Sequence, residues 1–285
     1  MLFSFLVTLR EGVEIALVIT ILLGYLRSIG QRRYFRAIWL GVGVAAAVCL
    51  AVGTGLEVAS RELDSTVVEG FEGFTMLFAV ALLTAMAFWM KRQARGISAE
   101  LRAQVDQALG AGSITALVLL AASSVGREGL ETTLFLFAGS STAGAGMGFV
   151  LGGVLGFAVA AVVGAGIYHG SSRIPLKPFF TISGVVVIVL AAGLASNGLA
   201  HLHESGLLAN LGARPWDTDA FISSTSTLGQ FLNTLLGYDS APAVAQIVLY
   251  WSYLIGVVAA FLFLPVASAP RPRSPRTAVS SPGRS

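Results

Sequence analysis

Residues 2–26, LFSFLVTLREGVEIALVITILLGYL, are long and apolar enough to cross a lipid bilayer, yet they contain Arg10, Glu11 and Glu14. About 20 apolar residues span the hydrocarbon core of a membrane. An ionisable side chain at the centre of such a helix costs about 2.5–3.5 kcal/mol on insertion scales, whereas a Leu stabilises it by only about 0.3–0.6 kcal/mol. These three charged side chains therefore need partners or a function.

The charged pentapeptide occurs twice, because Arg10-Glu11-Gly12-Val13-Glu14 recurs as Arg127-Glu128-Gly129-Leu130-Glu131 in a second apolar run. In each copy the two Glu are spaced i, i+3 and share one helix face, and the Arg lies i, i+4 from the second Glu and can pair with it. Four carboxylates and two guanidinium groups leave a formal charge of −2, which a cation or protons must offset inside a membrane. The pattern predicts a site for a hard, multiply charged cation bound by Glu11, Glu14, Glu128 and Glu131, with Arg10 and Arg127 as partners. The alternative is a pair of structural salt bridges, which the duplication disfavours.

The composition is that of a membrane protein. It is 55% hydrophobic and only 12% charged, whereas soluble domains carry about 25% charged residues. The sequence predicts an all-α polytopic domain over residues 1–268 and a disordered, Pro-, Ser- and Arg-rich tail over 269–285. No basic segment precedes the first apolar run, so a cleavable signal peptide is not expected. Seven spans are predicted, at residues 2–26, 37–57, 71–90, 113–138, 147–168, 179–200 and 242–265.

Basic residues set the expected orientation, because Lys and Arg near the ends of spans stay on the cytoplasmic side. They gather in the loops after the first, third, fifth and seventh spans, while the opposite loops are acidic. The N-terminus is therefore expected outside and the C-terminus inside. The basic residues are scattered over separate short loops, which argues against a nucleic-acid partner.

The two motif copies predict an inverted repeat. The first span runs inward and the fourth outward, so the two motif helices are antiparallel, which is typical of 3+3 inverted-repeat transporters with a site near the bilayer midplane. A seventh helix follows the repeat. Gly12 and Gly129 are expected to let the two motif helices approach each other closely.

Polar residues at the outer ends of spans suggest an entrance. Glu69 and Glu72 begin the third span at i, i+3 and either pass a cation inward or form a solvated helix N-terminus. His201, His203 and Glu204 end the sixth span and either relay a metal ion or mark a polar boundary. Short helices are expected around 99–109 and within 221–236, and the single Cys49 excludes an internal disulfide.

These motifs resemble the oxidase-dependent iron transporter family, which includes the bacterial EfeU and fungal high-affinity iron permeases. The likeness rests on Arg-Glu-Gly-x-Glu in the first and fourth spans. Looser matches are Glu69-Gly70-Phe71-Glu72, Trp89-Met90, Trp216-Asp217 and Gly237-Tyr238.

The resemblance implies a multi-pass plasma-membrane permease, not an enzyme, in which the four motif glutamates carry iron as the transported substrate, with no cofactor. It also implies ferric iron delivered after oxidation outside the membrane, and separate periplasmic partners, one metal-binding and one peroxidase-like. The residue types alone leave open another ion, Mn²⁺, Zn²⁺ or Fe²⁺. An intramembrane enzyme using paired Glu as acid and base is a further alternative.

Overall fold

The computed structural model describes residues 1–62, 65–93, 97–143, 146–170, 176–208, 210–224 and 226–263. Within these ranges all regular structure is helical, which confirms the predicted all-α class. The predicted disordered tail at 269–285 lies outside the described residues. The helices are α1 (Leu2–Ser28), η1 (Arg32–Tyr34), α2 (Phe35–Glu62), α3 (Ser65–Gln93), α4 (Ile97–Gly110), α5 (Ile114–Ala143), α6 (Met147–Tyr168), α7 (Leu176–Glu204), α8 (Thr227–Leu236) and α9 (Val244–Phe263).

Five helical segments of the described chain are long and apolar enough to cross a bilayer: Arg32–Ser60, Val67–Lys91, Met147–Tyr168, Thr181–Glu204 and Val244–Phe263. They coincide with five of the seven predicted spans. The other two predicted spans fall on α1 and α5, which are 27 and 30 residues long. Every 18-residue segment within α1 or α5 contains at least three charged residues, so neither helix has an uninterrupted apolar stretch of this kind.

The outer surfaces of α2, α6 and α9 are apolar and face away from the protein. Leu50 of α2, Val162 of α6 and Phe263 of α9 are 70%, 73% and 82% exposed. Helices with large apolar side chains on their exposed faces are stable in hydrocarbon and not in water. The chain is an integral membrane protein.

Helices α1 and α6 pack along their whole length through small residues at every fourth position. A Cβ built on Gly164 would lie 2.6 Å from Ala16, and one on Gly12 would lie 2.7 Å from Ala160. Contacts advance in the same direction on both helices, so α1 and α6 run parallel. The paired positions are Ser4 with Gly152, Thr8 with Gly156, Gly12 with Ala160, and Ala16 with Gly164.

Helices α5 and α2 repeat this arrangement. Gly41 meets Ala121, Gly129 meets Cys49 and Gly53 meets Thr133, again with contacts advancing in parallel. Residues 121, 129 and 133 of α5 each lie 117 positions after residues 4, 12 and 16 of α1, the same offset that separates Arg10 from Arg127. The surface that α1 presents to α6 therefore matches the surface that α5 presents to α2.

This packing corrects one expectation. The motif glycines do not bring α1 and α5 together; Gly12 contacts Ala160 and Phe157 of α6, and Gly129 contacts Cys49 of α2. The physical reason is helix geometry, because the glycine lies on a different face from the flanking Glu side chains. Each motif helix thus turns its carboxylates to the other motif helix and its glycine to a supporting helix.

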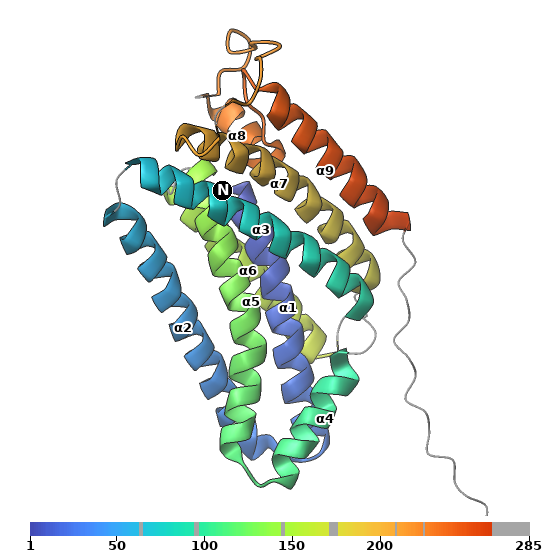
Figure 1. Cartoon of the computed structure of the whole chain (residues 1–285). Coiled ribbons are helices and arrows are strands. Elements are labelled where there is room, and N and C mark those ends of the chain that lie inside the picture. Colours follow the sequence, from blue (N-terminus) through green and yellow to red (C-terminus); the bar gives the residue numbers. More distant parts are fainter. Residues whose placement is uncertain are drawn as a thin grey trace, which may run out of the picture.

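Helices α3, α7 and α9 lie side by side along one flank of the molecule (Figure 1). Apolar side chains from α1, α3, α5 and α7 form a shared core that includes Val7, Leu83, Phe135 and Ala191. The short helix α4 matches the helix expected at 99–109 and closes one end of α1 and α5, where its Leu101 and Val105 pack with Leu22. These contacts hold α1 and α5 together on both sides of the charged motifs.

Helix α8 is the amphipathic helix expected within 221–236, but it starts later than the apolar spacing suggested. The Ser226 hydroxyl accepts a hydrogen bond from the Gly229 amide at 3.0 Å and caps the helix. Gly237 ends it with a φ of 67°, where its backbone meets Gly193 of α7. Phe221 lies outside the helix and is 90% exposed.

Candidate metal-binding site

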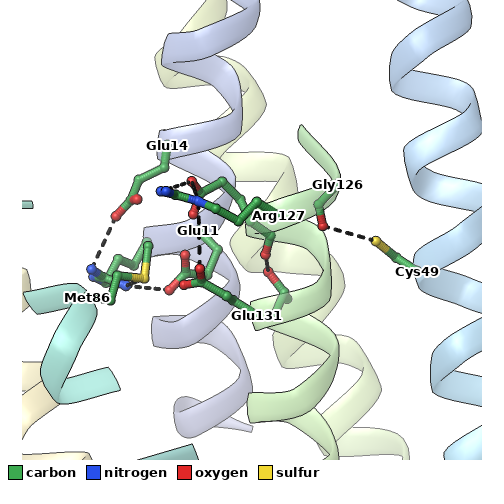
Figure 2. Close-up of polar contacts among 10 residues, drawn as sticks. Glu11, Glu14, Cys49, Met86, Gly126, Arg127 and Glu131 are labelled. Carbon is green, nitrogen blue, oxygen red and sulfur yellow. Dashed lines mark hydrogen bonds and ion pairs between the residues drawn. The ribbon is translucent and has the colours of Figure 1, made fainter. Parts of the chain in front are cut away.

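The two charged motifs face each other across the α1–α5 contact (Figure 2). Glu11 is fully buried at 0% exposure, and Glu14 and Glu128 are 4% and 5% exposed. The Glu131 side chain is 17% exposed. One carboxylate oxygen from each of Glu11, Glu128 and Glu131 lies within 4.8 Å of the others, and Glu14 lies outside this trio.

This spacing suits a single cation. Oxygen ligands lie at about 2.0–2.6 Å from Mg²⁺ or Ca²⁺, so two oxygens on opposite sides of such an ion are separated by about 4–5 Å. Among the residues that the structure describes, Glu11, Glu128 and Glu131 form the one group of three or more His, Cys, Asp or Glu that meets this geometric test. We call these three residues the glutamate cluster.

Each Arg pairs with both glutamates of its own motif. Arg10 binds Glu11 through Nη1 and lies 3.3 Å from Glu14 through Nη2. Arg127 lies 2.7 Å from Glu128 and 3.8 Å from Glu131. The predicted i, i+4 pairs are present, but in both motifs the neighbouring Glu is the closer partner. Helical spacing does not predict this contact, because adjacent side chains diverge on a helix and only the length of Arg bridges the gap.

The arginines do not satisfy all the carboxylate oxygens. Glu11 Oε2, Glu128 Oε2 and Glu131 Oε2 are buried and have no hydrogen-bond partner. An unpaired buried carboxylate oxygen is strongly unfavourable unless a positive group compensates it. Because every member of the glutamate cluster has such an oxygen, the cluster is built to accept positive charge from a ligand.

Two further side chains beside the motifs were not identified as contacts from the sequence. Met86 of α3 accepts a hydrogen bond from Arg10 Nη1 at 3.3 Å. Trp89 of α3 lies under Arg127, whose guanidinium carbon is 4.1 Å from the ring centroid. The spacing within α3 gave no signal, because both residues are typical of an apolar span and their role depends on how α3 crosses α5.

The predicted outer residues separate in the structure. His201 Nδ1 lies 3.7 Å from Glu72 Oε2, and both side chains are 20% exposed. His203 Nδ1 instead contacts the Leu208 carbonyl oxygen at 2.8 Å, and Glu204 is exposed. Glu69 is half-buried one turn before Glu72. The structure therefore joins His201 to Glu72 and directs His203 to the backbone.

Comparisons with known proteins agree on one family. The family described as "Iron permease FTR1 family" matches residues 1–275. "Ferrous iron permease EfeU" of Yersinia pestis is 35% identical over 271 residues, covering 94% of this chain and 96% of the relative. The protein of the same name from Escherichia coli O6:K15:H31 (strain 536 / UPEC) is 36% identical over 276 residues, covering 96% of this chain and 100% of the relative. No solved structure matches the chain.

Proposed function

The chain belongs to the iron permease FTR1 family, and from this premise we propose that iron crosses the membrane through the glutamates of its two motifs. As a member of this family it is a transporter of iron and not an enzyme, which removes the acid–base enzyme considered from the sequence. The observation that carries the proposal is the set of unpaired buried oxygens on Glu11, Glu128 and Glu131.

The mechanism follows from charge and position. The cation loses water on entering the cluster and gains carboxylate oxygens from both α1 and α5, so the low dielectric strengthens its binding. Arg10 and Arg127 hold the opposite oxygens of Glu11 and Glu128 and keep these side chains in place. Glu14, paired with Arg10 and lying one turn from Glu11, is the next acceptor along α1.

The formal charge of the site favours ferrous iron. Four carboxylates and two guanidinium groups sum to −2, which one Fe²⁺ neutralises and one Fe³⁺ exceeds. The relatives named above are called ferrous iron permeases. We therefore favour Fe²⁺ as the ion at the cluster over the ferric ion that the family resemblance implied. Oxidation outside the membrane, with its metal-binding and peroxidase-like partners, is the alternative route.

Three features support seven membrane spans in a 3+3 inverted repeat, with α1 and α5 as the two charged spans. The α1–α6 and α5–α2 contacts match residue for residue, as a pseudo-two-fold axis relating the two halves requires. Helices α3 and α7, the third members of each half, pack against each other. The basic loops support an N-terminus outside and a C-terminus inside, and the membrane we propose is the inner, or plasma, membrane.

An entrance at the outer ends of α3 and α7 fits this topology. Glu72 and His201 form a carboxylate–imidazole pair there, and Glu69 lies one turn away. A negative mouth raises the local cation concentration before the ion reaches the buried cluster. His203 and Glu204 belong to the same polar rim.

Purified protein in liposomes tests the function directly. We expect uptake of ⁵⁵Fe²⁺, kept reduced with ascorbate, to saturate, and to exceed uptake of chelated ⁵⁵Fe³⁺ in the absence of reductant. Higher uptake of Fe³⁺ would restore the ferric assignment, and absence of both would contradict transport by this chain alone. Excess Mn²⁺ or Zn²⁺ in the same assay tests the remaining divalent alternatives, since carboxylate sites discriminate poorly by ligand type.

Replacing Glu72 by Gln tests the entrance. We expect the half-saturating Fe²⁺ concentration to rise about three- to tenfold at low ionic strength and less at high salt, because a screened surface charge is removed. The maximal rate should stay unchanged. Glu100→Gln, at an exposed position of α4, is the matched control. Equal half-saturation for Glu72→Gln and the wild type at low salt would place the entrance elsewhere.

A further inference from the structure

The two motif arginines occupy equivalent sequence positions but different surroundings. The Arg10 side chain is 3% exposed, whereas that of Arg127 is 45% exposed. Arg10 is held by Glu11, Glu14 and Met86. Arg127 has less packing around it and lies over the ring of Trp89.

A cavity gives Arg127 room to move. Its volume is about 400 Å³, and it is lined by Arg127, Glu131, Met86 and Trp89 together with apolar residues of α3. The Arg127 guanidinium is therefore not confined by close packing, and its contact with Trp89 is one of the few interactions that fix its direction. Because the Arg127 side chain is 45% exposed, its cation–π contact contributes about 0.5–1 kcal/mol, which biases the direction of a loosely packed guanidinium.

The position of Arg127 decides which oxygens stay open. Both Nε and Nη2 bind the same atom, Glu128 Oε1, at 3.1 Å and 2.7 Å. Glu128 Oε2 and Glu131 Oε2 are left without a hydrogen-bond partner. A guanidinium released from Trp89 could bridge these two oxygens, since its five N–H groups favour bidentate carboxylate pairing. It would then occupy the cluster as an internal cation.

We propose that Trp89 is a positioning residue for iron binding, whose ring holds the Arg127 guanidinium to one side of Glu128 and keeps the glutamate cluster open to the metal ion. This inference rests on the proposed function. It assigns different tasks to the two motif copies. Arg10 is a fixed, buried counter-charge to Glu11 and Glu14, and Arg127 is a counter-charge whose place depends on α3.

The test compares Trp89→Leu, Trp89→Phe and Trp39→Leu in ⁵⁵Fe²⁺ uptake by liposomes. Trp89→Leu should raise the half-saturating Fe²⁺ concentration about fivefold, which corresponds to about 1 kcal/mol, with the maximal rate preserved. Trp89→Phe retains an aromatic face and should stay within about twofold of the wild type. Trp39→Leu removes a Trp that is 55% exposed on α2, away from the site, and should change neither value.

Several results would overturn the proposal. An unchanged half-saturating Fe²⁺ concentration in Trp89→Leu would mean that Trp89 has no role in binding. Equal increases of this concentration in the Leu and Phe variants, or a fall in maximal rate alone, would mean that Trp89 only packs against its neighbours. Should Trp89→Leu fail to reach the membrane or elute as aggregate, Trp89→Met replaces it with the same expected shift. If the wild type itself takes up no Fe²⁺, the proposed function fails first and this inference fails with it. Uptake by the wild type with no shift in the variant refutes the Trp89 role alone.

Discussion

Replacing Glu128 by Gln, or Glu11 by Gln, should reduce iron uptake by more than about a hundredfold while the protein remains folded in the membrane. Each change removes one of three carboxylates whose oxygens lie within 4.8 Å. The arginine of that motif then faces a neutral amide, and the formal charge of the site changes from −2 to −1. Removing one partner of a buried charge pair in a binding site, here a carboxylate facing the bound cation, costs about 2–5 kcal/mol of binding free energy, and about 3 kcal/mol already corresponds to more than about a hundredfold in affinity.

Thermal stability separates loss of binding from loss of folding. Without metal, the Glu128→Gln variant should melt at or above the wild-type temperature, because a buried oxygen without a partner has been made neutral. Added Fe²⁺ should raise the melting temperature of the wild type and not that of the variant, since ligands that bind the native state stabilise it. Glu100→Gln should behave as the wild type in both assays. Normal uptake by either motif variant would refute the glutamate route.

Much of the arrangement of the charged side chains along α1 and α5 could be predicted from the sequence, because the strongest signals in the sequence are local. Charged residues within apolar runs identified Glu11, Glu14, Glu128 and Glu131, and their i, i+3 spacing placed each pair on one helix face. The same offset of 117 relates Ser4, Thr8, Gly12 and Ala16 of α1 to residues 121, 125, 129 and 133 of α5, although only the motif repeat was predicted from the sequence. Periodicity and repetition are readable without knowledge of which helices touch.

The contacts that could not be predicted from the sequence are those that depend on how the helices cross. Gly12 and Gly129 were expected to face each other, and instead face α6 and α2. The contact of Trp89 with Arg127 requires one end of α3 to reach the middle of α5, which no spacing within either helix encodes. The pairing of His201, and not His203, with Glu72 likewise depends on the rotation of α7 against α3. Such contacts are tertiary and follow from packing alone.

Replacing Gly41 by Val should disrupt the α2–α5 interface, with a large loss of membrane protein and of uptake. A Cβ at Gly41 would contact the Val118 carbonyl oxygen and lie 3.0 Å from the Ala122 amide nitrogen, which are backbone atoms of α5. Helix backbone cannot move aside as a flexible side chain can, so the two helices must separate. Overpacking of this kind costs about 1–3 kcal/mol or more. The measurement is the yield of folded protein by size-exclusion chromatography in detergent, together with its melting temperature.

Gly43, two residues further along α2, provides the matched control. A Cβ at Gly43 meets no atom within 4 Å, and the residue is exposed. Gly43→Val makes the same chemical change on the same helix, so differences in helix propensity cancel. It should alter stability by no more than about 0.5 kcal/mol. Helix α2 contacts α5 at Gly129, between the motif residues Glu128 and Glu131. Normal stability and uptake of Gly41→Val would therefore mean that α5 holds its carboxylates in place without α2, and that the matched packing of the two halves has no structural role.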